Sequence, residues 1–198
     1  MDWINLEGKD PTKIYEVSDA TDEPIDIYRE RYKADPPQFF EPKLNRYYTN
    51  AIIEMEDNSS LLVFGSGHPK VMNHLPNACP NIGKMGCVDF MVEAGDGLDN
   101  HISYYNIDIL KEDLPTGYDY IFTSHTLEHF TRDQLLNIVM PRLQKAAGKA
   151  VVAVVPYGEA WGDEPSHKCR FWINDELSAM ASKYKIILQG HELVLWIG

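Results

Sequence analysis

The sequence predicts an α/β fold with a doubly wound, mostly parallel sheet of about seven strands and an antiparallel hairpin at its C-terminal end. Three observations support this prediction. Short apolar runs recur from residue 60 onward and end in Gly, Asp, Ser or Pro, as expected for strands buried on both faces. A segment of helical periodicity separates two of these runs. Two further runs near the C-terminus are separated by only a short link.

The first five strands follow from the apolar runs taken in order. We expect them at residues 61–64, 85–88, 104–109, 118–122 and 150–155. Between the fourth and fifth runs, residues 133–143 place apolar side chains at helical spacing, which predicts a helix with an apolar face of Leu135, Leu136, Val139 and Leu143. Strand, helix and strand in this order indicate parallel strands joined by right-handed crossovers.

The two ends of the chain do not follow this alternation of strand and helix. Residues 185–189 and 192–197 predict the antiparallel hairpin. Residues 1–59 are acidic, are interrupted by prolines and carry aromatic residues without a clear period, which predicts an irregular, partly helical cap. We therefore expect two parts, a cap of residues 1–59 and an α/β domain of residues 60–198.

The composition excludes several classes of protein. The 198 residues carry a formal net charge of −12, which argues against general binding to nucleic acid or to an anionic membrane surface. No apolar stretch approaches the ~20 residues of a membrane span, and the first residues lack the features of a signal peptide. Cys79, Cys87 and Cys169 are odd in number and form no CxxC pair, so we expect reduced thiols in a cytoplasmic protein.

The stretch 118–130 is the strongest indication of function. Its apolar run stops before Ser124, so polar groups emerge at the carboxyl end of a strand, the edge at which open α/β sheets bind ligands. If a helical turn begins near His125, then His125, Glu128 and His129 lie at i, i+3 and i+4 and share one face. Such groups can move protons, which makes these three the candidate catalytic residues.

Two glycines and two acids mark the ends of the first three predicted strands. Gly65 and Gly67 allow the backbone to turn tightly and to approach a ligand. We expect Gly67 to adopt a backbone conformation, such as a positive φ, that a residue with a β-carbon resists. Asp89 ends the second strand, where a carboxylate can accept two hydrogen bonds from a ribose diol. Asp108 can bind an adenine amino group. For the glycines the alternative is an ordinary structural turn, and for the acids it is helix capping.

In this order the pieces resemble class I S-adenosylmethionine-dependent methyltransferases over residues 58–198. The resemblance rests on the segments 61–68, 86–89 and 106–108, and on the Ser-His-x-Leu-Glu-His run at 124–129 that marks one branch of the family. It implies a Rossmann-like sheet and S-adenosylmethionine as the cofactor, bound by Gly65, Ser66, Gly67, Asp89, Phe90, Asp108, Ile109 and Ser124. It also implies methyl transfer to a small molecule or polar conjugate, with one of the three candidate catalytic residues as an optional base.

Three features depart from the family pattern. Val63 replaces an acid that orients the methionine end of the cofactor, and Pro69 replaces a glycine of the loop. The expected crossover helix after Asp89 is interrupted by Gly-Asp-Gly at 95–97, which predicts a short, irregular connection. The alternative function is therefore a catalytically silent S-adenosylmethionine-binding or interaction protein.

The histidine cluster has three interpretations. We favour a metal-free one, in which Glu128 and His129 bond backbone groups or act as a base. The second is a divalent ion held by His125, Glu128, His129 and His167. Small-RNA 2′-O-methyltransferases and ubiquinone-pathway O-methyltransferases carry Glu-x-x-Glu-His at the similar place and bind such an ion, and imidazole ligands favour a transition metal over magnesium. The third, a zinc peptidase of the H-x-x-E-H type, needs the motif inside a helix, whereas here it follows a strand.

Overall fold

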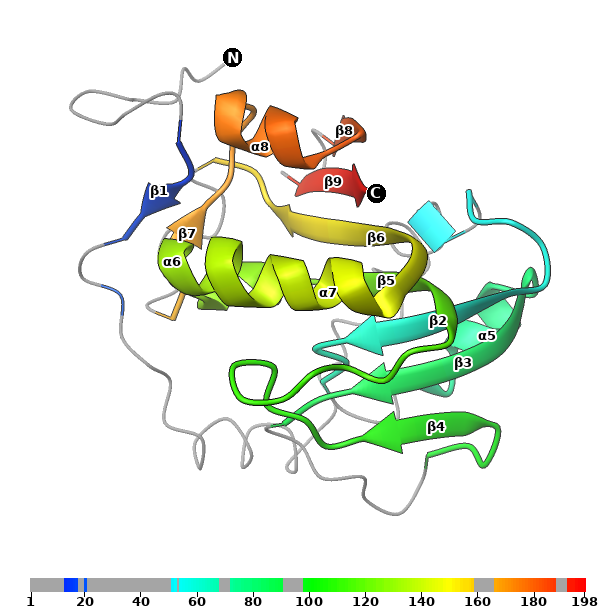
Figure 1. Ribbon diagram of the computed structural model, residues 1–198. Helices are drawn as coiled ribbons and strands as arrows, with labels where there is room; N and C mark the ends of the chain where they lie inside the picture. Colours follow the sequence, from blue (N-terminus) through cyan, green and yellow to red (C-terminus); the bar gives the residue numbers. More distant parts are fainter. Residues whose placement is uncertain are drawn as a thin grey trace.

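The computed structural model describes residues 13–17, 20, 51–52, 54–67, 72–90, 98–158, 166–187 and 192–198. A seven-stranded sheet runs through them in the order β4-β3-β2-β5-β6-β9-β8 (Figure 1). Its strands are β2 (Ser59–Phe64), β3 (Ile82–Val88), β4 (Ile102–Tyr105), β5 (Tyr118–Ser124), β6 (Ala147–Pro156), β8 (Lys183–Ile187) and β9 (Glu192–Ile197). Neighbouring strands are parallel except for β9, which is antiparallel to both β6 and β8. The predicted sheet and its C-terminal hairpin are confirmed.

The strand order places a switch point at the centre of the sheet. From β2 the chain builds outward through β3 to β4, and then returns to form β5 on the other side of β2. Because β2 and β5 are parallel neighbours whose crossovers leave in opposite directions, a crevice is expected outside their carboxyl ends. Phe64 and Ser124 end these two strands, so the predicted loop and the predicted histidine cluster start at the same edge.

The third strand lies earlier than predicted. β4 ends at Tyr105, so Asp108 and Ile109 belong to the turn that follows and not to the strand. The side chain of Ile109 is only 2% exposed and packs into the core from this turn. The apolar run therefore continues beyond the strand because the turn itself is buried.

The predicted helix between β5 and β6 is one continuous helical segment. It consists of α6 (Arg132–Gln134), a π-helical stretch η3 (Leu135–Val139) and α7 (Met140–Ala146). Thr131 begins it with a capping box, in which the Thr131 hydroxyl accepts from the Gln134 amide and the Gln134 side chain accepts from the Thr131 amide. Leu135, Val139 and Leu143 are fully buried against the sheet, as the periodicity predicts.

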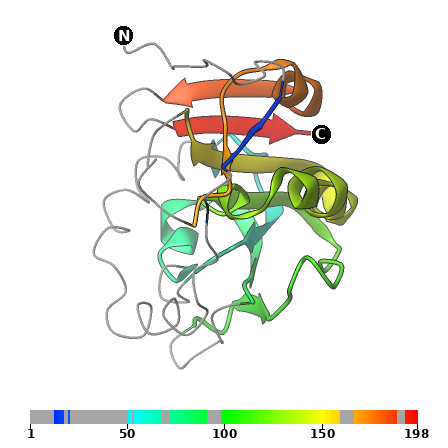
Figure 2. The ribbon, with the colours of Figure 1, turned by 90° about the vertical axis from the view of Figure 1, so that its left-hand side faces the viewer.

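Apolar side chains cover both faces of the central strands. Along β2, Leu62 and Phe64 face the core under α7 and α8 (Asp175–Met180), whereas Leu61 and Val63 face the opposite core. The opposite core is completed by side chains from the segment 51–55 and from α5 (Leu75–Ala78). Figure 2 shows α6 and α7 on one side of the sheet and α5 on the other, which is the doubly wound arrangement.

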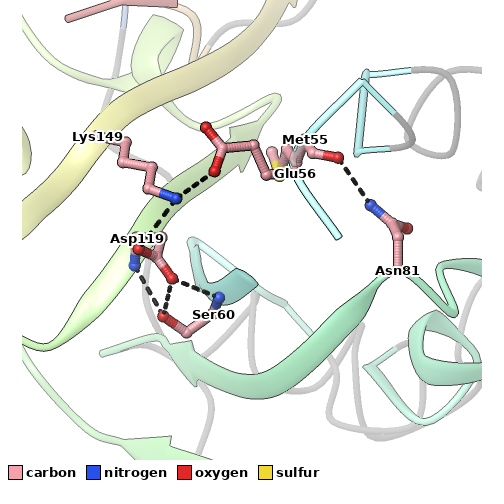
Figure 3. Close-up of polar contacts among 6 residues, drawn as sticks. All are labelled: Met55, Glu56, Ser60, Asn81, Asp119 and Lys149. Carbon is pink, nitrogen blue, oxygen red and sulfur yellow. Dashed lines mark hydrogen bonds and ion pairs between the residues drawn. The ribbon is translucent and has the colours of Figure 1, made fainter. Parts of the chain in front are cut away.

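A polar network locks the amino edge of the sheet, opposite the switch point (Figure 3). Asp119 Oδ2 on β5 accepts from the Ser60 amide over 2.9 Å and from the Ser60 hydroxyl over 2.8 Å, and the Asp119 amide donates back to that hydroxyl. Lys149 on β6 pairs with Asp119 at 3.5 Å and with Glu56 at 2.6 Å. Asn81 donates to the carbonyl of Met55, which fastens the segment before β2 to the start of β3. These contacts fix the register of β2 against β5.

Only part of the predicted cap of residues 1–59 is described. Its strand β1 (Tyr15–Glu16) pairs with β7 (Cys169–Arg170) in a separate two-stranded sheet, and the Ile14 amide donates to Glu176 on α8. Pro69 and the predicted connection at 95–97 lie outside the described residues. Within the described ranges, no helix is long and apolar enough to cross a membrane.

Candidate functional site

The loop after β2 takes the backbone conformation that its glycines permit. Gly65 has φ +68° and Gly67 has φ +62°, both in the left-handed region that residues with a β-carbon rarely adopt. The amides of Gly65 and Ser66 donate to the Val88 carbonyl at the end of β3. A β-carbon on Gly65 would lie 2.2 Å from the Thr126 hydroxyl oxygen, so the loop after β5 packs directly on this glycine. The positive φ expected at Gly67 is confirmed.

Asp89 is built into this loop and is not the exposed carboxylate that a strand end suggests. Its side chain is 7% exposed, and Oδ2 accepts from the Gly67 amide over 2.9 Å. Its carbonyl accepts from the Tyr104 hydroxyl and the Asn106 side chain, each over 3.2 Å. Asp89 therefore joins three chain segments at the carboxyl edge of the sheet.

Phe90, the next residue, is among the exposed large apolar side chains of the described chain. It is 40% exposed and lies two residues after β3, whose last four residues are buried. An exposed aromatic ring beside a buried acid can stack on a flat base while the acid binds the attached sugar. The structure thus brings Gly65, Gly67, Asp89 and Phe90 to one edge.

Asp108 and Ile109 lie in the turn after β4, and their side chains make contacts within the protein. Asp108 Oδ1 accepts from the Leu110 amide over 3.0 Å, and Oδ2 pairs with Lys111 at 2.8 Å, so the carboxylate closes its own turn. The alternative that the sequence left open was helix capping, whereas here the carboxylate caps a turn and not a helix. Ile109 is buried in the core, and its carbonyl accepts from Arg142. Contact of either residue with a cofactor stays a prediction.

Two serines lie nearly buried beside the switch point. Ser66 is 9% exposed and Ser124 is 8% exposed. The Ser66 hydroxyl lies next to the thiol of Cys87, whose pKa is raised to about 12 by burial. Ser124 is the last residue of β5, one position before the histidine cluster begins.

His125 occupies a strained position between two acids. Its φ is +48°, which is uncommon for a residue other than glycine and concentrates at functional sites. Its Nε2 lies 3.1 Å from Oε1 of Glu192 at the start of β9, and its Nδ1 lies 3.5 Å from Oε1 of Glu128. Burial lowers the pKa of His125, but the two carboxylates outweigh burial and raise the pKa to about 9. The imidazole is therefore positively charged at neutral pH.

Glu128 and His129 lie on a single 3₁₀ turn, η2 (Leu127–His129), and His125 precedes that turn. The expected shared helical face is thus only partly formed, although His125 still reaches Glu128. Glu128 is fully buried; burial raises its pKa, yet His125, with His129 and His167, outweighs burial and holds the pKa below its usual value. His129 turns toward a distant segment, where its Nδ1 lies 3.2 Å from the Ser166 carbonyl oxygen.

His167 joins Glu128 and His129, as one interpretation of the sequence requires. Its ring meets that of His129 edge to face with centroids 5.0 Å apart, and its Nε2 lies 3.8 Å from Glu128 Oε1. Sequence reasoning missed Glu192, Ser166 and Thr126, the partners of His125, His129 and Gly65. Glu192 and Ser166 lie far along the chain from the histidines and come near them only in the folded protein. Thr126 lies next to His125, but nothing in the local sequence indicates that its side chain packs on Gly65.

Comparison with known proteins identifies the fold. No family model matches the chain, and no curated protein matches it in sequence. A chain of the complex between the Haloferax volcanii Trm112 methyltransferase activator and its proposed methyltransferase superposes with a TM-score of 0.65 at 13% identity, covering 90% of this chain and 98% of that one. The N-methyltransferase NodS of Bradyrhizobium japonicum, in complex with S-adenosylhomocysteine, gives 0.61 at 15% identity, covering 84% and 93%.

Several larger methyltransferases share the same fold. The O-methyltransferase NcsB1 of neocarzinostatin biosynthesis, in complex with S-adenosylmethionine and 2-hydroxy-5-methyl naphthoic acid, gives a TM-score of 0.58 at 15% identity over 85% of this chain. The chain spans 59% of the length of NcsB1 and 61% of that of SibL, an S-adenosylmethionine-dependent methyltransferase. At these identities the likeness establishes the Rossmann-like fold of class I methyltransferases.

Proposed function

We propose that this protein binds S-adenosylmethionine at the carboxyl ends of β2, β3 and β5 and transfers its methyl group to a small molecule or a polar conjugate. The observation that carries the proposal is the junction of Gly67 with Asp89. A positive-φ glycine loop at the switch point donates to a strand-end carboxylate, and an exposed aromatic ring follows at Phe90.

Each part of this edge suits one part of the cofactor. The carboxylate of Asp89 lies at the carboxyl edge of the sheet beside Gly67, and a carboxylate there can accept the hydrogen bonds that a ribose diol donates. The ring of Phe90 suits the adenine, with Asp108 and Ile109 in the next turn. The Gly65–Gly67 backbone, Ser66 and Ser124 suit the methionine end, because they lie nearest the switch point between β2 and β5.

Methyl transfer is an in-line displacement in which the acceptor forms a bond to the methyl carbon as the bond from that carbon to sulfur breaks. S-adenosylhomocysteine leaves, and an acceptor that carries a proton gives it up. Such a reaction depends chiefly on positioning the two reactants. His125, as an imidazolium, lacks a lone pair with which to take a proton, so we assign it as a positioning residue that ties the end of β5 to β9 through Glu192.

The second candidate, a silent cofactor-binding protein, is favoured by two observations. Val63 is 4% exposed and packs in the apolar core, so it provides no carboxylate for the methionine end of the cofactor. The carboxylate of Asp108 is engaged by its own turn. Both features are expected to lower the cofactor affinity and the rate of transfer, but both leave the hydrogen bond between Gly67 and Asp89 intact.

Two measurements separate the candidates. Titration with S-adenosylhomocysteine, followed by a crystal structure of the complex, is expected to place the ribose on Asp89. Incubation with S-adenosylmethionine that carries a labelled methyl group, against panels of hydroxyl and amine acceptors, is expected to label at least one acceptor class. Binding without transfer to any acceptor favours the silent protein, and absence of binding contradicts both.

A further inference from the structure

A second group of side chains gathers beside the end of β5, and the proposed cofactor contacts do not use it. Glu128, His129 and His167 each place one ligand atom within 4.8 Å of the others. We propose that these three residues bind a divalent transition-metal ion. The proposal goes beyond methyl transfer and does not depend on it, since ion binding is measured without the cofactor.

Backbone contacts hold the three residues in place. The Lys168 amide donates to the Glu128 carbonyl over 2.7 Å, which fastens η2 to the segment that carries His167. That segment continues into β7, which pairs with β1. Two parts of the chain far apart in sequence are thus fixed on either side of the cluster, so the ligand positions exist without an ion. Such preorganisation is what a metal site requires of its scaffold.

The tautomer of His129 suits a metal ligand. A backbone carbonyl can only accept a hydrogen bond, so His129 Nδ1, at 3.2 Å from the Ser166 oxygen, carries the proton and donates it. In the neutral imidazole this leaves the lone pair on Nε2. Metal-binding histidines characteristically donate their other ring N–H to a carbonyl or carboxylate, which fixes the ring and raises its basicity.

Glu128 supplies the independent observation that points to a ligand. Its side chain is 0% exposed, and neither carboxylate oxygen has a hydrogen-bond partner among the described residues. Its contacts are the longer ion pairs from Oε1 to His125 at 3.5 Å and to His167 at 3.8 Å. A buried carboxylate normally has hydrogen-bond partners or coordinates a metal, because its burial is costly.

The ligand atoms would lie closer together around an ion than the 4.8 Å within which they now lie. Bonds of ~2.0–2.2 Å to nitrogen and oxygen put two ligands of a tetrahedral ion roughly 3–3.5 Å apart. The separation of 3.8 Å between His167 Nε2 and Glu128 Oε1 is close to that range. Two imidazoles and one carboxylate suit zinc, manganese, iron or cobalt, whereas magnesium and calcium prefer oxygen ligands throughout.

The site differs from the four-residue set that the sequence suggests. Both ring nitrogens of His125 face carboxylates, Nδ1 toward Glu128 and Nε2 toward Glu192. His125 is therefore a neighbour that orients Glu128 and not a ligand. Three protein ligands leave at least one coordination position for water or an acceptor oxygen. With an ion bound, the Nε2 lone pair of His129 is occupied, so His129 cannot also act as a base.

Metal analysis tests the proposal directly. The purified full chain is first assayed for bound metal, then stripped with chelator and titrated with ZnCl₂, CoCl₂ and MnCl₂ by calorimetry, with the visible absorption of Co(II) as a second signal. We expect one ion per chain. In His167→Ala, affinity should fall by more than the roughly 10- to 100-fold that loss of an outer hydrogen bond to a ligand typically costs. His101→Ala, which removes an exposed histidine before β4, is the matched control and should bind as the wild type does.

Glu128→Gln tests the second ligand type, and circular dichroism of each stripped variant checks that it is folded. If Glu128→Gln fails to fold, His167→Ala decides, because His167 is at the edge of the cluster with 12% of its side chain exposed. Failure of all three ions to bind the wild type, or equal binding by folded His167→Ala, overturns the proposal. Neither result bears on cofactor binding, which is measured separately.

Discussion

The amide of Gly67 donates to Oδ2 of Asp89 over 2.9 Å and so joins the loop after β2 to the end of β3. The same carboxylate holds the positive-φ loop in shape and is the proposed acceptor of hydrogen bonds from a ribose. Because one side chain serves both purposes, the two are best distinguished by comparing a substitution that removes only the charge with one that removes the charge and the hydrogen bond.

Asp89→Asn keeps an oxygen that can accept from Gly67 but loses the charge and one acceptor, whereas Asp89→Ala loses both functions. Since hydrogen bonds to charged groups contribute ~1.5–3 kcal/mol, we expect both variants to bind S-adenosylhomocysteine about 10- to 100-fold more weakly. Only Asp89→Ala should also melt at a clearly lower temperature. Calorimetry and thermal melts measure these effects.

Asp57→Asn is the matched control, because Asp57 is an exposed carboxylate in the segment before β2, on the amino side of the sheet. It should leave both affinity and melting temperature unchanged. Wild-type affinity in both Asp89 variants would remove Asp89 from the cofactor site.

Gly65→Ala should destabilise the protein. A residue with a β-carbon at φ +68° costs ~1–3 kcal/mol, and the new methyl group would overlap the side chain of Thr126. The double variant Gly65→Ala/Thr126→Gly removes the overlap but not the strained φ, so it should recover part of the loss. Chemical denaturation of the two single variants and the double variant measures this coupling. Additive effects, or a Gly65→Ala protein as stable as the wild type, would show that the two loops do not pack as described.

The amino-edge network should make stability depend on acid pH. Hydrogen bonds from the amide and the hydroxyl of Ser60 hold the pKa of Asp119 below its ordinary value. A carboxyl with a depressed folded pKa stabilises the fold above its unfolded pKa of ~3.9, and this contribution is lost as pH falls through the folded pKa. Asp119→Asn should therefore melt lower than the wild type at neutral pH, and the gap should close as pH falls below ~4. Melting curves that stay parallel from neutral pH to pH ~3 would contradict this role.

The three cysteines should be unreactive in the native protein. Burial raises the pKa of Cys79 to about 11 and, as the main effect, that of Cys87 to about 12, and Cys169 is 1% exposed. Because the thiolate is the nucleophile, iodoacetamide at pH ~8 should label the folded protein slowly and the denatured protein at all three positions. Mass spectrometry counts the adducts. Rapid labelling of folded protein would mean that one of these thiols is more accessible than the structure indicates.

The sequence predicted most of the sheet because central parallel strands are apolar on both faces. β2, β5 and β6 each contain a continuous apolar run, and their side chains divide between two cores. The end of the third strand was misplaced, since Ile109 is buried in a turn and carries the same signal as a strand residue. The pairing of β1 with β7 had no local signal, because two-residue strands from distant segments pair only in the folded chain.

The parts of the candidate site that directly follow a predicted strand could be predicted from the sequence. Gly65, Gly67 and Asp89 follow strand ends, and parallel strand ends meet at one edge. The environment of the histidines was not predictable, because Glu192 and Ser166 reach His125 and His129 from distant segments of the chain. Only that environment raises the pKa of His125 to about 9 and buries Glu128 fully.

The central claim is that the edge formed by Gly65, Gly67, Asp89 and Phe90 binds the cofactor. Calorimetric titration of the wild-type chain with S-adenosylhomocysteine tests it most directly, with NAD as a competitor because other open α/β sheets bind dinucleotides at the same edge. We expect saturable binding of one molecule per chain, which NAD does not displace and which Asp89→Asn weakens. Absence of saturable binding up to ~1 mM, in a protein that melts cooperatively, would contradict it.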